Sequence, residues 1–218
     1  MKAHSERVPN KNIKPFNGDP LFFAIVRTLQ HTERITKIVI NTDSNRIADM
    51  ATKTFSKVQI NWRPTELQGD FVSMNNIIDF DLKSFPEQEH FLQTHTTNPL
   101  LRVETLTRAI EQYEEVLKQS YDSVFGVTRY LSRFYWQNAQ AINHNPAELI
   151  RTQDLPPIFE ENSNLYLFSK ASFHAADKKR IGLKPYLFEI NKLEAVDIDD
   201  ESDFILAETL AKQFGSAK

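Results

Sequence analysis

Apolar and polar residues follow two spacings along the chain, one typical of strands and the other typical of helices. Short runs with strand character lie at residues 37–43, 58–62, 91–93, 123–128, 164–168, 185–190 and 195–198. Amphipathic helical spacing covers residues 21–29, 47–55, 71–80, 103–117 and 201–214. Strands that alternate with helices of this length predict an α/β fold with a mostly parallel, doubly wound (Rossmann-like), three-layer sheet. Ligands of such a sheet bind at the carboxyl ends of its strands.

This alternation lapses between residues 129 and 157, where aromatic and polar residues are mixed and the segment closes with two prolines. We therefore divide the chain into an α/β core at 1–128, an excursion at 129–157 and a return to the core at 158–218. Aromatic residues such as Tyr135 and Trp136 are typical of protein interfaces when they are exposed. A loop folded back on its own core is the alternative interpretation.

Composition and charge narrow the function classes. The 218 residues carry a net charge of −3, which argues against general binding to nucleic acids or membranes. There is no cysteine, so a metal site must use oxygen or histidine ligands, and a reducing cytoplasm is the expected compartment. The longest apolar run near the start, Leu21–Val26, is far too short to span a bilayer. We expect a soluble, cytoplasmic protein.

A carboxylate pair lies near the end of the chain. Asp197 and Asp199 are two residues apart at the expected end of a strand, so both side chains would project to the same face and could share a hard cation such as Mg²⁺. Helix capping is the alternative, because Asp200 and Glu201 would stabilise the start of the following helix in any case.

The N-terminal segment is a polar loop that leads into an apolar helix. Its cations are Lys2, Arg7, Lys11 and Lys14. Such a cluster can bind a polyanion, for example a nucleoside triphosphate, once water is excluded. An ordinary solvated surface is the alternative, because runs of charge normally face water.

Several motifs, in order along the chain, resemble those of the CMP-sialate synthetase (acylneuraminate cytidylyltransferase) family, which is of nucleotide-diphospho-sugar transferase type. They lie at residues 9–21, 63–70, 95–100, 160–166 and 196–204. The first contains Pro9-Asn10-Lys11-Asn12-Ile13, and the last contains Val196-Asp197-Ile198-Asp199, close to the I-D-I-D signature of the family. The N-terminal loop departs from the family pattern at Lys2, His4 and Glu6 and agrees with it at Ser5, Pro9, Lys11 and Asn12.

This resemblance implies an enzyme that transfers CMP from CTP to an acidic sugar, either sialic acid or a related nonulosonic acid, and releases pyrophosphate. It further implies Mg²⁺ (or Mn²⁺) as cofactor and a homodimer in which residues 129–157 reach the second subunit. Two alternatives stay open. One is an enzyme like CMP-KDO synthetase, and the other is a catalytically impaired nucleotide-binding or interaction protein on the same fold.

The resemblance also assigns roles to individual residues. The catalytic residues are Lys11 and Asp199, and the metal ligands are Asp197 and Asp199. The nucleotide-binding residues are Lys2, Ser5, Lys11, Asn12, Arg63 and Ser73. The sugar-binding residues are Gln93, His95, Asn162 and Tyr166. From the residues alone, Arg63 could instead pair with Glu66, His95 could be a core or capping residue, and Tyr166 could be core.

The family places a short apolar strand before the nucleotide loop, in the middle of the sheet, whereas here the loop begins at the second residue. A parallel sheet without this strand would leave backbone groups of both neighbouring strands unpaired, at about 1–3 kcal/mol for each buried group. We therefore expect the natural reading frame to begin upstream, with Met1 near the end of that strand.

Overall fold

The computed structural model describes residue 1, residues 8–69 and residues 71–214. Its α-helices are α1 (Leu21–His31), α2 (Asn45–Thr54), α3 (Met74–Leu82), α4 (Val103–Leu117), α5 (Lys170–Ala175) and α6 (Glu201–Phe214). Its strands are β1 (Pro15–Phe16), β2 (Asp19–Pro20), β3 (Ile38–Thr42), β4 (Val58–Trp62), β5 (His90–Gln93), β6 (Ser123–Tyr130), β7 (Ile158–Ser169) and β8 (Pro185–Glu189). Short 3₁₀ helices occur at η1 (Lys11–Ile13), η2 (Thr65–Leu67) and η3 (Thr152–Asp154).

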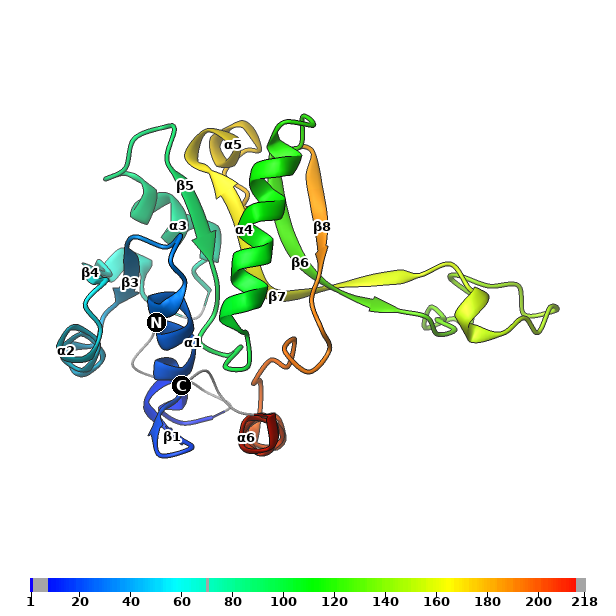
Figure 1. Ribbon diagram of the computed structural model, residues 1–218, viewed down its shortest axis with the longest axis horizontal. Coiled ribbons are helices and arrows are strands. Elements are labelled where there is room, and N and C mark those ends of the chain that lie inside the picture. The colour runs from blue at the N-terminus through cyan, green and yellow to red at the C-terminus, as the bar shows by residue number, and fades with distance from the viewer. Residues whose placement is uncertain (2–7, 70, 215–218) are drawn as a thin grey trace.

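The largest sheet has four strands in the order β5-β7-β6-β8 (Figure 1). Strand β7 runs antiparallel to both β5 and β6, whereas β8 runs parallel to β6. The fold is α/β, as predicted, but the prediction of a mostly parallel sheet is wrong for the described strands. The reason is that β7 returns from the excursion directly beside β6, without the helical crossover that a parallel neighbour requires.

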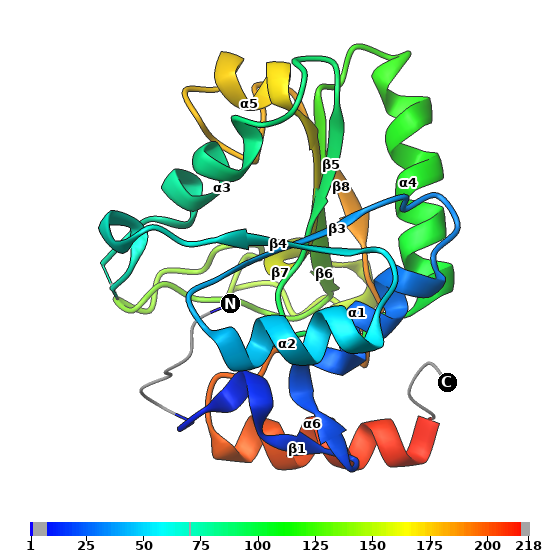
Figure 2. The ribbon, with the colours of Figure 1, turned by 90° about the vertical axis from the view of Figure 1, so that its left-hand side faces the viewer.

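A second ladder pairs β3 with β4 in parallel, and within the described part of the chain it is separate from the four-stranded sheet. Figure 2 shows this ladder running across the direction of β5. The same view shows the four-stranded sheet nearly edge-on, with α3 and α5 on one side and α4 on the other.

Helices α1 and α4 form the main core because their apolar residues recur at helical spacing. In α4 the buried residues Leu106, Ala109, Tyr113 and Val116 form a stripe at intervals of three and four. They pack in one cluster with α1, β3 and β6. Burial of each large apolar side chain in such a cluster contributes about 1.5–3 kcal/mol.

Helix α6 packs in a separate apolar cluster. Phe204, Ala207 and Ala211 on α6 pack against Phe16 in β1 and Leu21 at the start of α1. Figure 2 shows α6 along the base of the molecule, next to β1. Because Asp197 and Asp199 directly precede this helix, its packing also fixes where they lie.

The segment between β6 and β7 forms a long arm that leaves the body of the molecule (Figure 1). Tyr135 and Trp136 on the arm are 51% and 62% exposed, so these aromatic side chains are not folded onto the core. Asn143 ties the arm together, since its side chain donates to the backbone oxygens of Ser132 and Pro156.

Two local expectations are corrected by the structure. Residues 195–198 are irregular rather than a strand, because they pair with no strand in the described part of the chain. Strand β7 begins at Ile158, six residues before the expected start at 164. None of the described helices has the length and apolar character that crossing a bilayer requires.

Candidate functional site

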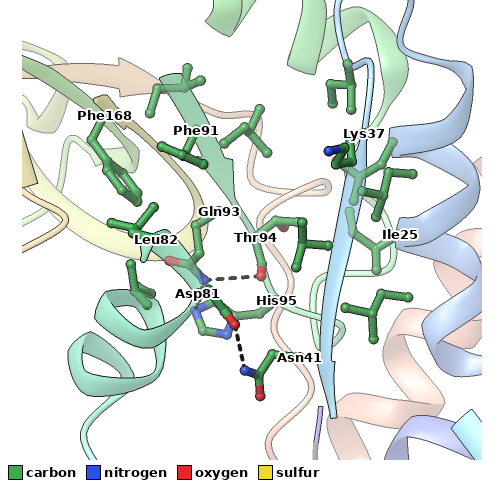
Figure 3. Close-up of a pocket in the computed structure, with 18 of the residues that line it drawn as sticks. Ile25, Lys37, Asn41, Asp81, Leu82, Phe91, Gln93, Thr94, His95 and Phe168 are labelled. Atoms are coloured by element: carbon green, nitrogen blue, oxygen red, sulfur yellow. Dashed lines mark hydrogen bonds between the residues drawn. The ribbon is translucent and has the colours of Figure 1, made fainter. Parts of the chain in front are cut away.

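A cavity of about 990 Å³ lies between β3, β5 and the helices α1, α3 and α4. Apolar side chains of these elements line much of it, and polar side chains gather at the end where β3 and β5 finish. Figure 3 shows Gln93, Thr94 and His95 near Asp81 and Asn41 at this end. Ligands are therefore expected at the carboxyl ends of these strands.

Two candidates from the nucleotide loop line this cavity, Lys11 and Asn12 in η1. The hydroxyl of Thr96 donates to Oδ1 of Asn12 at 2.6 Å. The ammonium of Lys11 donates to the backbone oxygen of Ile198. The loop is thereby fixed both to the turn after β5 and to the acidic segment before α6. Lys2 and Ser5 lie outside the described residues.

Arg63, directly after β4, is buried and lines the same cavity. Its Nε donates to Oδ1 of Asn41 at 2.6 Å, and the amide of Asn41 donates to the Asp81 carboxylate at 2.7 Å. Burial lowers the pKa of Arg63, and the nearby charges of Asp43 and Asp81 oppose that shift. In the described part of the chain the guanidinium contacts Asn41, so the alternative pairing with Glu66 is not observed.

Three of the sugar-binding candidates converge on a residue that the sequence did not single out, Arg180. Its Nη1 donates to Oε1 of Gln93 at 2.8 Å, and its Nη2 donates to the hydroxyl of Tyr166 at 3.0 Å. The guanidinium lies 3.7 Å from the centre of the Tyr166 ring. Nε2 of His95 is 3.3 Å from Nη1, and the Tyr166 hydroxyl also donates to Glu161.

His95 is held in its neutral form. Nε2 of its ring lies 3.0 Å from the side-chain nitrogen of Gln93 and near Nη1 of Arg180, both of which are N–H donors. Burial lowers the pKa of His95 to about 4, with additional effects from the positive charges of Arg180 and the Met1 amino group. The ring therefore accepts at Nε2 and carries its proton on Nδ1 at neutral pH.

Several other candidates do not line this cavity, and two of them, Ser73 and Asn162, have structural partners. The side chain of Ser73 caps α3 by accepting from the backbone N–H of Asn75 at 3.3 Å. Asn162 is buried, donates to the hydroxyl of Thr128 at 3.2 Å and accepts from the backbone N–H of Asn164 at 3.2 Å. The binding roles of Ser73 and Asn162 stay predictions. Sequence alone cannot distinguish a helix cap or a buried structural residue from a ligand contact.

The carboxylate pair lies in the irregular segment between β8 and α6. The backbone N–H of Ile198 donates to the oxygen of Thr97 at 2.9 Å, so this segment is fixed to the turn after β5. Partial removal from water raises the pKa of Asp197, and the charge of Asp199 raises it further. A hydrogen bond with the Thr97 side chain and the charge of Lys11 act in the opposite direction.

The neighbouring acidic residues cap α6. The Asp203 carboxylate accepts from the backbone N–H groups of Asp199 and Asp200 at 2.9 and 3.0 Å. Asp200 accepts from the backbone N–H groups of Ser202 and Asp203. The capping interpretation therefore holds for Asp200 and Asp203. The role of Asp197 and Asp199 as metal ligands stays a prediction, and Asp197 lies beside Lys11.

The donors suit a hard cation that is shared with a substrate. Among the described residues, no group of three or more His, Asp or Glu side chains is placed to hold a metal. Mg²⁺ needs fewer protein ligands than this, because it uses one or two carboxylates together with phosphate oxygens and water. Asp197 and Asp199 are close enough for the charge of one to affect the other, and they fit that requirement.

A cytidylyltransferase family model matches residues 1–214 of this chain. An N-acylneuraminate cytidylyltransferase A of Danio rerio is 30% identical over 98% of this chain and 50% of its own length. A CMP-N,N'-diacetyllegionaminic acid synthase of Legionella pneumophila is 27% identical over 96% of this chain and 92% of its own length. The chain thus spans about half the length of the first relative.

Solved structures with low sequence identity share the fold. A CMP:2-keto-3-deoxy-manno-octonic acid synthetase complexed with CTP has a TM-score of 0.68 at 8% identity, covering 98% of this chain and 96% of that one. A 4-diphosphocytidyl-2C-methyl-D-erythritol synthase of Anaerococcus prevotii has the same TM-score at 12% identity, covering 97% of this chain and 93% of that one. Since the family model covers nearly the whole sequence, this chain belongs to the cytidylyltransferase family.

Proposed function

We propose that this chain transfers CMP from CTP to an acidic sugar of the sialic acid or nonulosonic acid type and releases pyrophosphate. The observation that carries this proposal is a single cavity lined by Lys11, Asn12 and Arg63 from the nucleotide motifs and by Gln93 and His95 from the sugar motif. Relatives named as N-acylneuraminate, legionaminic acid and pseudaminic acid enzymes support an acidic nine-carbon sugar over the KDO alternative.

The residues divide the work along the cavity. Lys11 and Asn12 would bind the triphosphate, and Arg63 would donate to the cytosine and ribose end of CTP. The anomeric hydroxyl of the sugar would attack the α-phosphorus, forming an O–P bond as the bond to pyrophosphate breaks and the hydroxyl proton passes to solvent. No covalent enzyme intermediate is needed, because positioning and charge stabilisation can supply the rate.

Asp197 and Asp199 are the residues that would hold Mg²⁺ or Mn²⁺, together with phosphate oxygens of CTP. Such a cation neutralises charge on the phosphates and lowers the pKa of a bound hydroxyl. Lys11 supports the same region, since it bonds to the backbone between these two carboxylates. The Asp203 carboxylate accepts from the backbone N–H of Asp199 and so holds Asp199 in place.

We also propose that the chain is a homodimer joined through the arm. The exposed Tyr135 and Trp136 side chains on the arm support this assembly. A cytoplasmic location is consistent with the absence of cysteine.

The test is pyrophosphate release with CTP, Mg²⁺ and a panel of acidic sugars. Asp199→Asn should lower turnover by at least about 100-fold, because it removes a charged ligand while keeping the shape of the side chain. Asp200→Asn is the matched control, since asparagine also caps helices and turnover should stay near that of the unmodified chain. Near-normal turnover of Asp199→Asn in saturating Mg²⁺ contradicts the metal assignment, and CTP binding without turnover of any sugar would favour a catalytically impaired binding protein.

A further inference from the structure

We propose that Arg180 is a positioning residue of the sugar subsite, which orients Gln93 and His95 for an anionic sugar. This inference rests on the function proposed above. Gln93 and His95 line the cavity. Arg180 contacts both of these side chains and also the hydroxyl of Tyr166. Arg180 would therefore act through these two side chains rather than on the reacting atoms.

The contacts of Arg180 fix which atoms of the cavity wall donate and which accept. Because Nη1 donates to Oε1 of Gln93, the amide nitrogen of Gln93 is turned toward His95. Nε2 of His95 is then the acceptor of this group, and its Nδ1–H is left as a neutral donor. The stacking of the guanidinium on Tyr166, at 3.7 Å, limits its rotation.

The charge of Arg180 is only loosely balanced. The nearest carboxylate oxygen among the described residues belongs to Glu161, at 3.8 Å from Nη2, and the Glu161 side chain is 43% exposed. The other partners of the guanidinium are Gln93, neutral His95 and the Tyr166 hydroxyl. The Arg180 cation therefore contacts Gln93 and His95 directly, whereas the carboxylate of Glu161 lies beyond it, and this arrangement favours an anionic ligand.

The loop between α5 and β8, which bears Arg180, is held by Asp122, directly before β6, and by Ser123, the first residue of β6. The Asp122 carboxylate accepts from the backbone N–H groups of Leu183 and Lys184 at 2.8 and 3.1 Å. The hydroxyl of Ser123 accepts from the N–H of Gly182 at 2.8 Å. A Cβ atom at Gly182 would lie 2.1 Å from an Asp122 oxygen, so either the Asp122 side chain or the loop would have to shift.

The charged groups that act on His95 are Arg180 and the Met1 amino group, both positive, with Glu161 beyond Arg180. Removing the Arg180 guanidinium removes one positive charge and one N–H donor from the surroundings of the His95 ring. The pKa of His95 should then rise from about 4. This titration tests the contact between Arg180 and His95 itself, whereas the difference between the two KM values tests whether that contact serves the sugar.

The experiment uses the full chain and two readouts, NMR titration of labelled histidine and steady-state kinetics. Arg180→Met should move the His95 midpoint upward and raise KM for the sugar roughly tenfold or more, with KM for CTP changed by less than about twofold. Arg180→Lys should keep the His95 midpoint low, because the charge remains, but leave KM for the sugar high, because an ammonium lacks the planar fork.

Two further variants separate position from charge. Gly182→Ala should reproduce the sugar KM defect with Arg180 still present, because the added Cβ collides with the Asp122 carboxylate that holds the loop. Lys178→Met removes a cation from the same loop that pairs with Asp79 on the surface, and it should change neither readout.

An unshifted His95 midpoint in Arg180→Met overturns the proposal. If the wild-type chain turns over, an unchanged KM for the sugar in Arg180→Met overturns it as well. Absence of turnover by the wild-type chain would instead refute the proposed function. The titration, which needs no substrate, would still decide whether Arg180 controls His95.

Discussion

Tyr166→Phe removes one oxygen atom from the centre of the Arg180 cluster and should destabilise the protein measurably. The Tyr166 side chain is buried, and its hydroxyl donates to Glu161 and accepts from Arg180 at 3.0 Å. Hydrogen bonds to charged groups contribute about 1.5–3 kcal/mol each. Because the Glu161 and Arg180 side chains are 43% and 19% exposed and can regain water, we expect a total loss of about 2 kcal/mol.

For a chain of this size a loss of about 2 kcal/mol lowers Tm by roughly 4–8 °C, which differential scanning calorimetry resolves. Tyr130→Phe is the matched control, since its hydroxyl donates to Glu160 at 2.9 Å in an exposed position. The control should cost less than about 0.5 kcal/mol. Equal Tm losses for the two variants would refute the argument, because it depends on burial and not on the presence of a Tyr–Glu hydrogen bond.

Two other predictions concern the nucleotide end and the arm. Arg63→Ala should raise KM for CTP more than KM for the sugar, because Arg63 lines the cavity beside Asn41, and equal increases in steady-state kinetics would contradict base-side recognition. Light scattering at micromolar concentration should show a dimer, and Trp136→Ser should shift it toward monomer, since this side chain is 62% exposed on the arm. A wild-type chain that is monomeric under these conditions contradicts the second prediction.

The sequence was sufficient to predict the α/β class. It also singled out Lys11, Arg63 and His95, which are far apart in sequence and line the same cavity, while their roles stay predictions. The direction of β7 was not predictable in the same way. Alternating apolar residues indicate that a segment is a strand, but they are the same for parallel and antiparallel neighbours.

Arg180 and Asp197 show two other limits of prediction from sequence. Arg180 follows Lys178 and Lys179, and such a run of cations normally indicates a solvated loop. The contacts with Gln93 and Tyr166 depend on the path of the loop across β6, which only the fold provides. Asp197 was placed on a strand because apolar residues flank it, yet Ile198 is buried through the α6 cluster rather than through a ladder.

The turn after β5, residues 94–98, connects the parts of the site. Thr96 donates to Asn12 of the nucleotide loop, and the backbone oxygen of Thr97 accepts from Ile198 between the two candidate metal ligands. His95, one residue before Thr96, contacts Arg180 in the sugar cluster. A short turn therefore holds the groups that would bind triphosphate, cation and sugar at fixed separations, and this is what a direct transfer between two substrates requires. Because the three groups share this support, a change in the turn backbone would disturb both substrates together, whereas changes at Arg63 or Arg180 would act on one substrate each.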